Sequence, residues 1–124
     1  MSDDAGGSDD VARADDAEGE AVAESAVDAD LESVVDDLFA TIEDRKRNLP
    51  AGSYTASLFT HEKGENAVLE KLGEESTELI LAAKDDDTEE LAAESADFLY
   101  HLLVLLSMKG MDPDDLREEL ESRF

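Results

Sequence analysis

The stretch ESADFLYHLLVLL, residues 94–106, decides the fold predicted for this chain. Its apolar residues occupy almost every direction around a helix, and a helix that is apolar on all sides is buried in protein. An advance of about 100° per residue places four residues on one stripe of this helix. They are Glu94, Asp97, His101 and Leu105. Glu94 and Asp97 are therefore expected to point into the protein and not into bulk water.

A second group of carboxylates lies in the preceding stretch KLGEESTELI, residues 71–80. The same projection places four residues on one stripe of another helix. They are Lys71, Glu75, Glu78 and Ala82, and Glu74 lies beside them. A short turn normally makes consecutive helices antiparallel neighbours, so this stripe is expected to face the acids of the 94–106 helix.

Four buried carboxylates would raise one another's pKa values and destabilise the fold unless a cation binds them. Oxygen-only ligation favours Mg²⁺, with Mn²⁺ as the alternative, over iron or zinc. In a chain with 35 acidic residues, an E-x-x-E pattern alone has little meaning. The prediction rests on E-x-x-E followed, after fifteen residues, by E-x-x-D on a helix too apolar for the surface.

Apolar periodicity and capping signals predict an all-α fold, a bundle of about four helices per chain. Helices are expected over about 31–47, 65–84, 88–109 and 113–124, and the segment 48–64 is expected to form a loop. Asp87 and Asp112 have the spacing of N-caps, and Pro113 suits a first helical position. Gly73, inside the second helix, costs about 1 kcal/mol relative to alanine, which indicates that something approaches the backbone closely.

The N-terminal segment differs in composition from the rest of the chain. Residues 1–30 carry eleven acidic residues and one arginine, without any aromatic residue or leucine. Such a segment buries too little apolar surface to offset its ordering entropy, so it is predicted to be a disordered or weakly helical acidic tail. The folded domain is expected to span 31–124.

Charge and cysteine content exclude several classes of function. A formal charge of −25 makes nucleic acids and anionic membrane surfaces poor partners, and it suits a halophilic source, where salt screens self-repulsion. The absence of cysteine excludes disulfides, thiolate metal sites and cysteine nucleophiles. The longest apolar run, residues 102–106, is far shorter than a membrane span, and the N-terminus lacks a signal peptide pattern, so a soluble cytoplasmic protein is expected.

The carboxylate array resembles the all-α nucleoside triphosphate pyrophosphatase superfamily, which has the MazG-type fold. Three stretches are similar to the phosphoribosyl-ATP pyrophosphatase family within it, and the resemblance covers about 31–124. They are GSYTASLFT at 52–60, KLGEESTELILAAK at 71–84 and ESADFLYHLLVLL at 94–106. The resemblance implies a homodimeric, Mg²⁺-dependent helical bundle that hydrolyses phosphoribosyl-ATP to phosphoribosyl-AMP and pyrophosphate, the second step of histidine biosynthesis.

The resemblance also implies roles for individual residues. The metal-binding carboxylates of the family match Glu75, Glu78, Glu94 and Asp97. Either Glu74 or Glu75 is expected to accept the proton of the attacking water. The candidate substrate-binding residues are Lys71, Lys84, Ser53, Tyr54, Thr55 and His101. A lone histidine such as His101 is otherwise more often a core residue than a ligand.

Two other functions remain open from the sequence. One is a house-cleaning pyrophosphatase that hydrolyses non-standard or deoxynucleoside triphosphates on the same scaffold. The other is a non-catalytic helical dimer whose acids bind cations for stability alone. A homodimer is expected in each case, because the 94–106 helix has more apolar surface than one antiparallel partner can cover.

Overall fold

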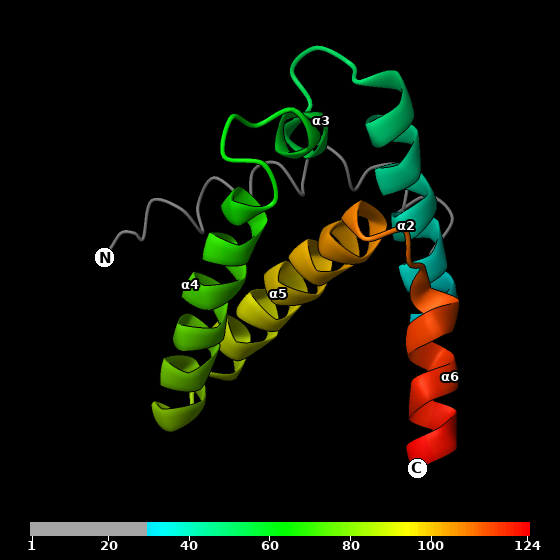
Figure 1. The fold of residues 1–124 in the computed structure, drawn as a ribbon. Coiled ribbons are helices and arrows are strands. Elements are labelled where there is room, and N and C mark those ends of the chain that lie inside the picture. The colour runs from blue at the N-terminus through cyan, green and yellow to red at the C-terminus, as the bar shows by residue number, and fades with distance from the viewer. Residues whose placement is uncertain (1–29) are drawn as a thin grey trace.

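A computed structural model describes residues 30–124, which form five helices and no strand (Figure 1). The helices are α2 (Leu31–Asn48), α3 (Tyr54–Phe59), α4 (Asn66–Lys84), α5 (Thr88–Met108) and α6 (Pro113–Arg123). The prediction of an all-α fold is confirmed. The predicted acidic tail lies outside the described residues, apart from Asp30.

Local capping interactions begin the helices where the sequence predicts. The Asp87 carboxylate accepts a hydrogen bond from the backbone N–H of Glu90 at 3.1 Å and begins α5. At α6, Asp112 accepts from the N–H of Asp115, and the Asp115 carboxylate accepts from the N–H of Asp112 in return. These bonds satisfy backbone donors that have no partner within the helix, so the sequence alone determines these boundaries.

The segment 48–64, which was expected to be a loop, contains the short helix α3. Ser53 begins it by accepting a hydrogen bond from the N–H of Ala56 at 3.1 Å. Thr55, Ala56 and Leu58 are buried. A helix of six residues is too short to be stable by itself and is formed by its packing against the other helices.

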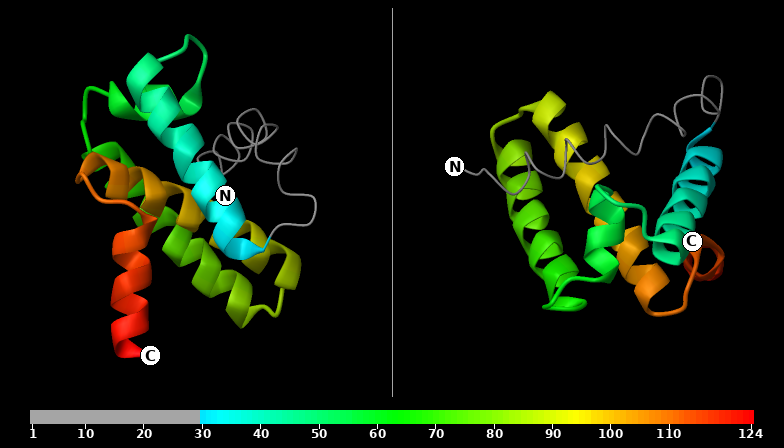
Figure 2. Two further views of the ribbon diagram at one scale, coloured as in Figure 1. Left: turned by 90° about the vertical axis from the view of Figure 1, so that its right-hand side faces the viewer. Right: turned by 90° about the horizontal axis from the view of Figure 1, so that it is seen from above.

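The central element is α5, which packs against α4 on one side and α2 on the other (Figures 1 and 2). The helices α4 and α5 form an antiparallel hairpin, α3 packs against α2, and α6 extends away from α4. The buried core consists of residues from α2, α3, α4 and α5. They are Ile42, Leu58, Val68, Tyr100, Leu103 and Val104.

Within residues 30–124, no other helix makes the close approach to the backbone that the glycine at position 73 indicates. A Cβ atom built on Gly73 meets nothing within 4 Å inside this chain. The Gly73 carbonyl accepts hydrogen bonds from the hydroxyls of Ser76 and Thr77.

By length and composition, α5 could cross a membrane. Such evidence is weak, because the central helix of a water-soluble protein has the same length and composition. In this chain α5 carries three buried ionisable side chains, those of Glu94, Asp97 and His101. Its apolar character is accounted for by its contacts with α2 and α4.

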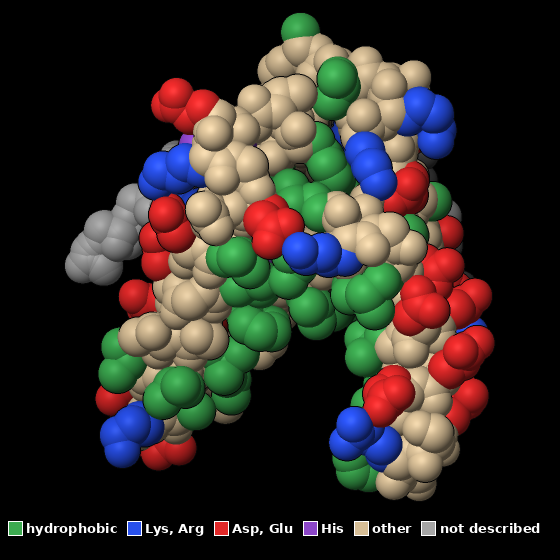
Figure 3. Space-filling view, viewed as in Figure 1, with side chains coloured by type: hydrophobic (Ala, Val, Ile, Leu, Met, Phe, Trp, Pro, Cys, Tyr) green, Lys and Arg blue, Asp and Glu red, His purple; other side chains and the backbone are tan. Residues whose placement is uncertain are grey.

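Apolar side chains gather in the hollow between the α4–α5 hairpin and α6 (Figure 3). An apolar groove of about 430 Å³ runs between α2, α5 and α6. Several large apolar residues of the described chain are exposed. They include Leu69, Ile80, Leu81, Leu116, Leu120 and Phe124. The chain therefore presents apolar surface that its own helices leave uncovered.

Candidate active site

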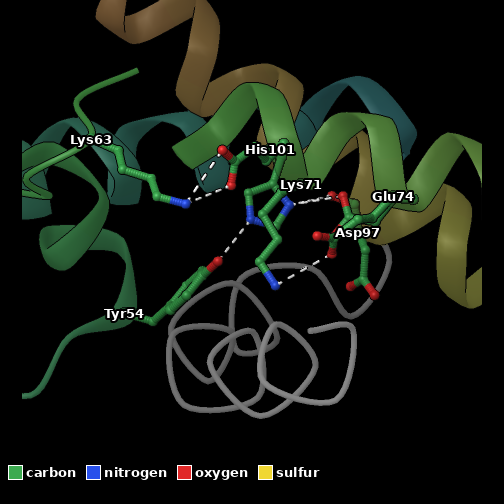
Figure 4. Close-up of polar contacts among 8 residues, drawn as sticks. Tyr54, Lys63, Lys71, Glu74, Asp97 and His101 are labelled. Atoms are coloured by element: carbon green, nitrogen blue, oxygen red, sulfur yellow. Dashed lines mark hydrogen bonds and ion pairs between the residues drawn. The ribbon is translucent and has the colours of Figure 1, made fainter. Parts of the chain in front are cut away.

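A hydrogen-bonded chain of three side chains, two of them fully buried, joins α3, α5 and α4. In it, Nδ1 of His101 lies 2.9 Å from Oε1 of Glu75, and Nε2 of His101 lies 3.1 Å from the Tyr54 hydroxyl (Figure 4). The same Nδ1 lies 3.2 Å from the carbonyl oxygen of Asp97. Two oxygens face Nδ1, so Nδ1 carries a proton and donates to them. The chain therefore fixes the orientation of the Glu75 carboxylate.

The helix α3 is held against α5 by a second pair of hydroxyls. Thr55 and Tyr100 are both buried, and their hydroxyl groups are hydrogen bonded to each other. The ring of Tyr100 packs edge-on against His101, with 4.9 Å between the ring centroids. Because Tyr54 and Thr55 are adjacent, this pair also determines where the Tyr54 hydroxyl meets His101.

Three carboxylates are buried at the interface of α4 and α5. Glu75, Glu94 and Asp97 are 1%, 2% and 7% exposed, and Oε2 of Glu75 has no hydrogen-bond partner among the described residues. Burial raises the pKa of Glu75, and hydrogen bonding to His101 opposes that rise. Burial, helped by the neighbouring acids Glu90 and Asp97, raises the pKa of Glu94 to about 8. The three carboxylates (the carboxylate cluster) are therefore costly to ionise together.

The chemistry of this cluster fits a hard divalent cation. Every donor is a carboxylate oxygen, the ligand type that Mg²⁺ and Mn²⁺ prefer. A cation would satisfy the buried Oε2 of Glu75 and offset the repulsion that raises the pKa of Glu94. Within residues 30–124, no three acidic or histidine side chains already converge closely enough to enclose a metal ion. The donor set fits, and its side chains would have to turn inward to close around a cation.

The other two predicted acids lie at the edge of the cluster. Glu78 follows Glu75 by one turn and is half-buried. Its charge is not among the main causes of the raised pKa values of Glu75 and Glu94. The Glu74 side chain is exposed and lies 3.8 Å from Nζ of Lys71 (Figure 4). Of the four acids expected to bind metal, three are buried at the interface of α4 and α5, and Glu78 is half-buried.

The candidate substrate-binding residues lie at different distances from the cluster. Lys71 lies one turn before Glu75, and its charge lowers the pKa of Glu75. Lys84 is exposed at the end of α4, about 13 Å along the helix axis from Glu75, so the structure does not bring it to the cluster. The Ser53 hydroxyl caps α3.

A family model described as phosphoribosyl-ATP pyrophosphohydrolase matches residues 35–124, which include every residue of the carboxylate cluster. The chain belongs to this family. A relative from Haloarcula marismortui is 81% identical over 94 residues, which cover 76% of this chain and 96% of that protein. A relative from Natronomonas pharaonis is 73% identical over 76% of this chain and 93% of its own length. A relative from Methanocella arvoryzae is 48% identical over 75% of this chain and 98% of its own length. All three are named phosphoribosyl-ATP pyrophosphatase.

Sequence reasoning missed three polar residues near the candidate site, Glu90, His61 and Lys63. Glu90 lies one turn before Glu94 and shares a side-chain hydrogen bond with it. His61 and Lys63 line a cavity next to Tyr54 and Lys71. The signal for Glu90 was its spacing of four residues from Glu94, whereas nothing in the sequence placed the 61–63 segment against α4.

Proposed function

We propose that this chain hydrolyses phosphoribosyl-ATP to phosphoribosyl-AMP and pyrophosphate, the second step of histidine biosynthesis. The observation that carries the proposal is the buried cluster of Glu75, Glu94 and Asp97 in a chain that belongs to this family. A core with a purely structural role would not favour three neighbouring carboxylates, because burying their charges costs free energy. A site that binds a cation and a triphosphate gives them a use.

The cluster residues would hold Mg²⁺, or Mn²⁺ in its place, with Glu78 completing the set from the next turn of α4. When bound, the cation supplies charge neutralisation for the phosphates of the substrate. His101 keeps Oε1 of Glu75 fixed by its hydrogen bond, which leaves Oε2 to face the site. Fixing a ligand in this way lowers the entropy lost when the site closes.

Hydrolysis also needs a group that accepts the proton of the attacking water. Water attacks phosphorus at the α–β bridge, the bond to the leaving phosphate group breaks, and the proton passes to a carboxylate. Glu75 is engaged by His101, whereas Glu74 lies outside the buried cluster with an exposed side chain. We therefore assign ligand binding to Glu75 and proton acceptance to Glu74. Lys71, beside Glu74, would contact a phosphate oxygen.

The enzyme is proposed to act as a homodimer in the cytoplasm, at high salt. The uncovered apolar residues of α4 and α6 support a second copy, because such a surface is unfavourable in water. Light scattering in molar salt should give twice the chain mass of 13.4 kDa. The charge of −25 supports a halophilic setting and disfavours nucleic acids and membranes as partners.

The direct test is pyrophosphate release from phosphoribosyl-ATP with Mg²⁺ in molar salt. A panel that includes ATP and deoxynucleoside triphosphates separates this activity from that of a house-cleaning enzyme. Asp97→Asn should abolish release, whereas Glu118→Gln, an exposed acid on α6, should leave it unchanged. Full activity of Asp97→Asn would overturn the site, and Mg²⁺ binding without any nucleotide affinity would favour a structural cation site.

A further inference from the structure

A small cavity of about 150 Å³ lies beside the carboxylate cluster, between α3, the turn at 60–65 and the first half of α4. Tyr54, which hydrogen bonds to His101, forms part of its wall, and so does Lys71, one turn from Glu75. Glu74, the proposed proton acceptor, also lines the cavity, and four further polar lining residues have no role in the site described above. They are Ser57, His61, Lys63 and Glu70.

Two lysines line the cavity, and each is paired with a carboxylate of the same lining, Glu70 or Glu74. The protein has five lysines and 35 acidic residues, yet Lys63 and Lys71 both line this one cavity. His61 adds a further donor, because its Nδ1 accepts a hydrogen bond from the backbone N–H of Lys63 at 3.0 Å. That bond assigns the proton of the neutral ring to Nε2, which can donate. Donors from three segments therefore line a space that would suit an anion once the lining carboxylates Glu70 and Glu74 are displaced.

Both lysines are held by carboxylates that an anion could replace. Nζ of Lys63 lies 3.0 Å from Oε1 of Glu70, and Nζ of Lys71 lies 3.8 Å from Oε1 of Glu74 (Figure 4). The Lys63 and Glu70 side chains are both more than half exposed. Exposed pairs of this kind contribute little to stability and less still at high salt. A phosphate dianion, with twice the charge of a carboxylate, would compete well for Lys63.

We propose that this cavity binds the phosphate of the substrate's phosphoribosyl group, a phosphate monoester that ATP itself lacks. The proposal rests on the function proposed above. Glu70, the partner of Lys63, precedes Glu75 by five residues, about 7.5 Å along the axis of α4. A phosphate at Lys63 is therefore a different one from the phosphate held at the carboxylate cluster. Lys63 is the residue that distinguishes phosphoribosyl-ATP from a plain nucleoside triphosphate.

The test compares Lys63→Ala with Lys109→Ala in the full chain. Lys109 is a matched control, because it is equally exposed and forms an ion pair with Glu65 at 2.9 Å, outside the cavity lining. Lys63→Ala should raise the KM for phosphoribosyl-ATP by about tenfold or more and leave kcat nearly unchanged. Lys63→Arg, which keeps the charge, should recover most of the loss. Lys109→Ala should behave as the wild type.

A binding measurement separates the two phosphates of the ligand. Calorimetry with Mg²⁺ should show that the wild type binds phosphoribosyl-AMP more tightly than AMP and that Lys63→Ala removes the difference. An equal loss of affinity for both ligands would overturn the proposal, because Lys63 would then contact the nucleotide phosphate. If the wild type releases no pyrophosphate from phosphoribosyl-ATP, the proposed function itself fails. If it does, and Lys63→Ala matches Lys109→Ala, only the subsite fails.

The Lys63–Glu70 pair gives a variant with the opposite effect. Glu70→Gln removes the carboxylate that competes with the phosphate, so the KM for phosphoribosyl-ATP should fall about two- to threefold. Glu65→Gln, which breaks the control pair with Lys109, should leave KM unchanged. A KM that is unchanged or raised by Glu70→Gln would contradict the displacement of Glu70 by substrate.

Discussion

The Nδ1 atom of His101 lies 2.9 Å from Oε1 of Glu75, and both side chains are fully buried between α5 and α4. Through this bond, the orientation of the Glu75 carboxylate of α4 depends on the His101 imidazole of α5. The imidazole is in turn hydrogen bonded to Tyr54 of α3. The orientation of a proposed cation ligand is thus determined by three helices. Lone buried histidines are common in cores, but this one bridges the candidate site to the helix that borders the substrate cavity.

Replacing His101 should weaken cation binding more than it changes the fold. His101→Gln keeps a donor of similar length and should retain structure, whereas His101→Phe leaves Glu75 buried without its partner and should cost about 2–4 kcal/mol of stability. Titration with Mn²⁺, followed by electron paramagnetic resonance, should show an affinity about tenfold lower in His101→Gln. An unchanged affinity for Mn²⁺ would show that His101 has a structural role alone.

The two adjacent glutamates should separate into different kinetic roles. Glu75→Gln removes a proposed ligand and should lower both Mn²⁺ affinity and activity. Glu74→Gln should keep Mn²⁺ affinity but lower kcat by at least about 100-fold, because the water loses its proton acceptor. Glu118→Gln is the control for the charge change. Normal kcat in Glu74→Gln would move proton acceptance to another carboxylate.

The metal-free protein should lose stability as pH rises from about 5 to 8. Burial raises the pKa of Glu75 and brings that of Glu94 to about 8, so the folded state holds more protons than the unfolded state in this range. The free energy of unfolding then falls with rising pH. Calorimetric Tm values at constant salt should show this fall with a chelator.

Mg²⁺ should raise Tm more at pH 8 than at pH 5, because cations compete with those protons. A Tm that rises with pH in the presence of the chelator would contradict the raised pKa values.

Gly73→Ala should stabilise the monomer fold by about 1 kcal/mol. Among residues 30–124, no atom outside the adjoining backbone of α4 lies within 4 Å of an added Cβ, and alanine favours a helix interior over glycine. Denaturant unfolding measures the gain, and Ser76→Ala, one turn further on, shows the effect of losing a hydroxyl that bonds to Gly73. A stable variant with lost activity or lost dimerisation would reveal that a substrate or second copy approaches Gly73.

Helix ends and the carboxylate stripes could be predicted from the sequence, because both depend on local spacing. Asp87 and Asp112 cap their helices through bonds to residues three positions away. The pattern of apolar residues around Glu94 and Asp97 indicated their burial, which the structure confirms. These features follow from the geometry of a single helix and need no knowledge of its neighbours.

Only the tertiary structure decided which groups meet. It formed α3 from a segment expected to be a loop, and it placed His101 between Tyr54 and Glu75. It also left Gly73 uncovered by the other described helices and brought Lys63 and Lys71 to the same cavity. Such contacts join residues far apart in the chain, and they depend on how whole helices pack and on the burial free energy they share. Local spacing determined the candidate ligands of this protein, whereas helix packing determined their partners.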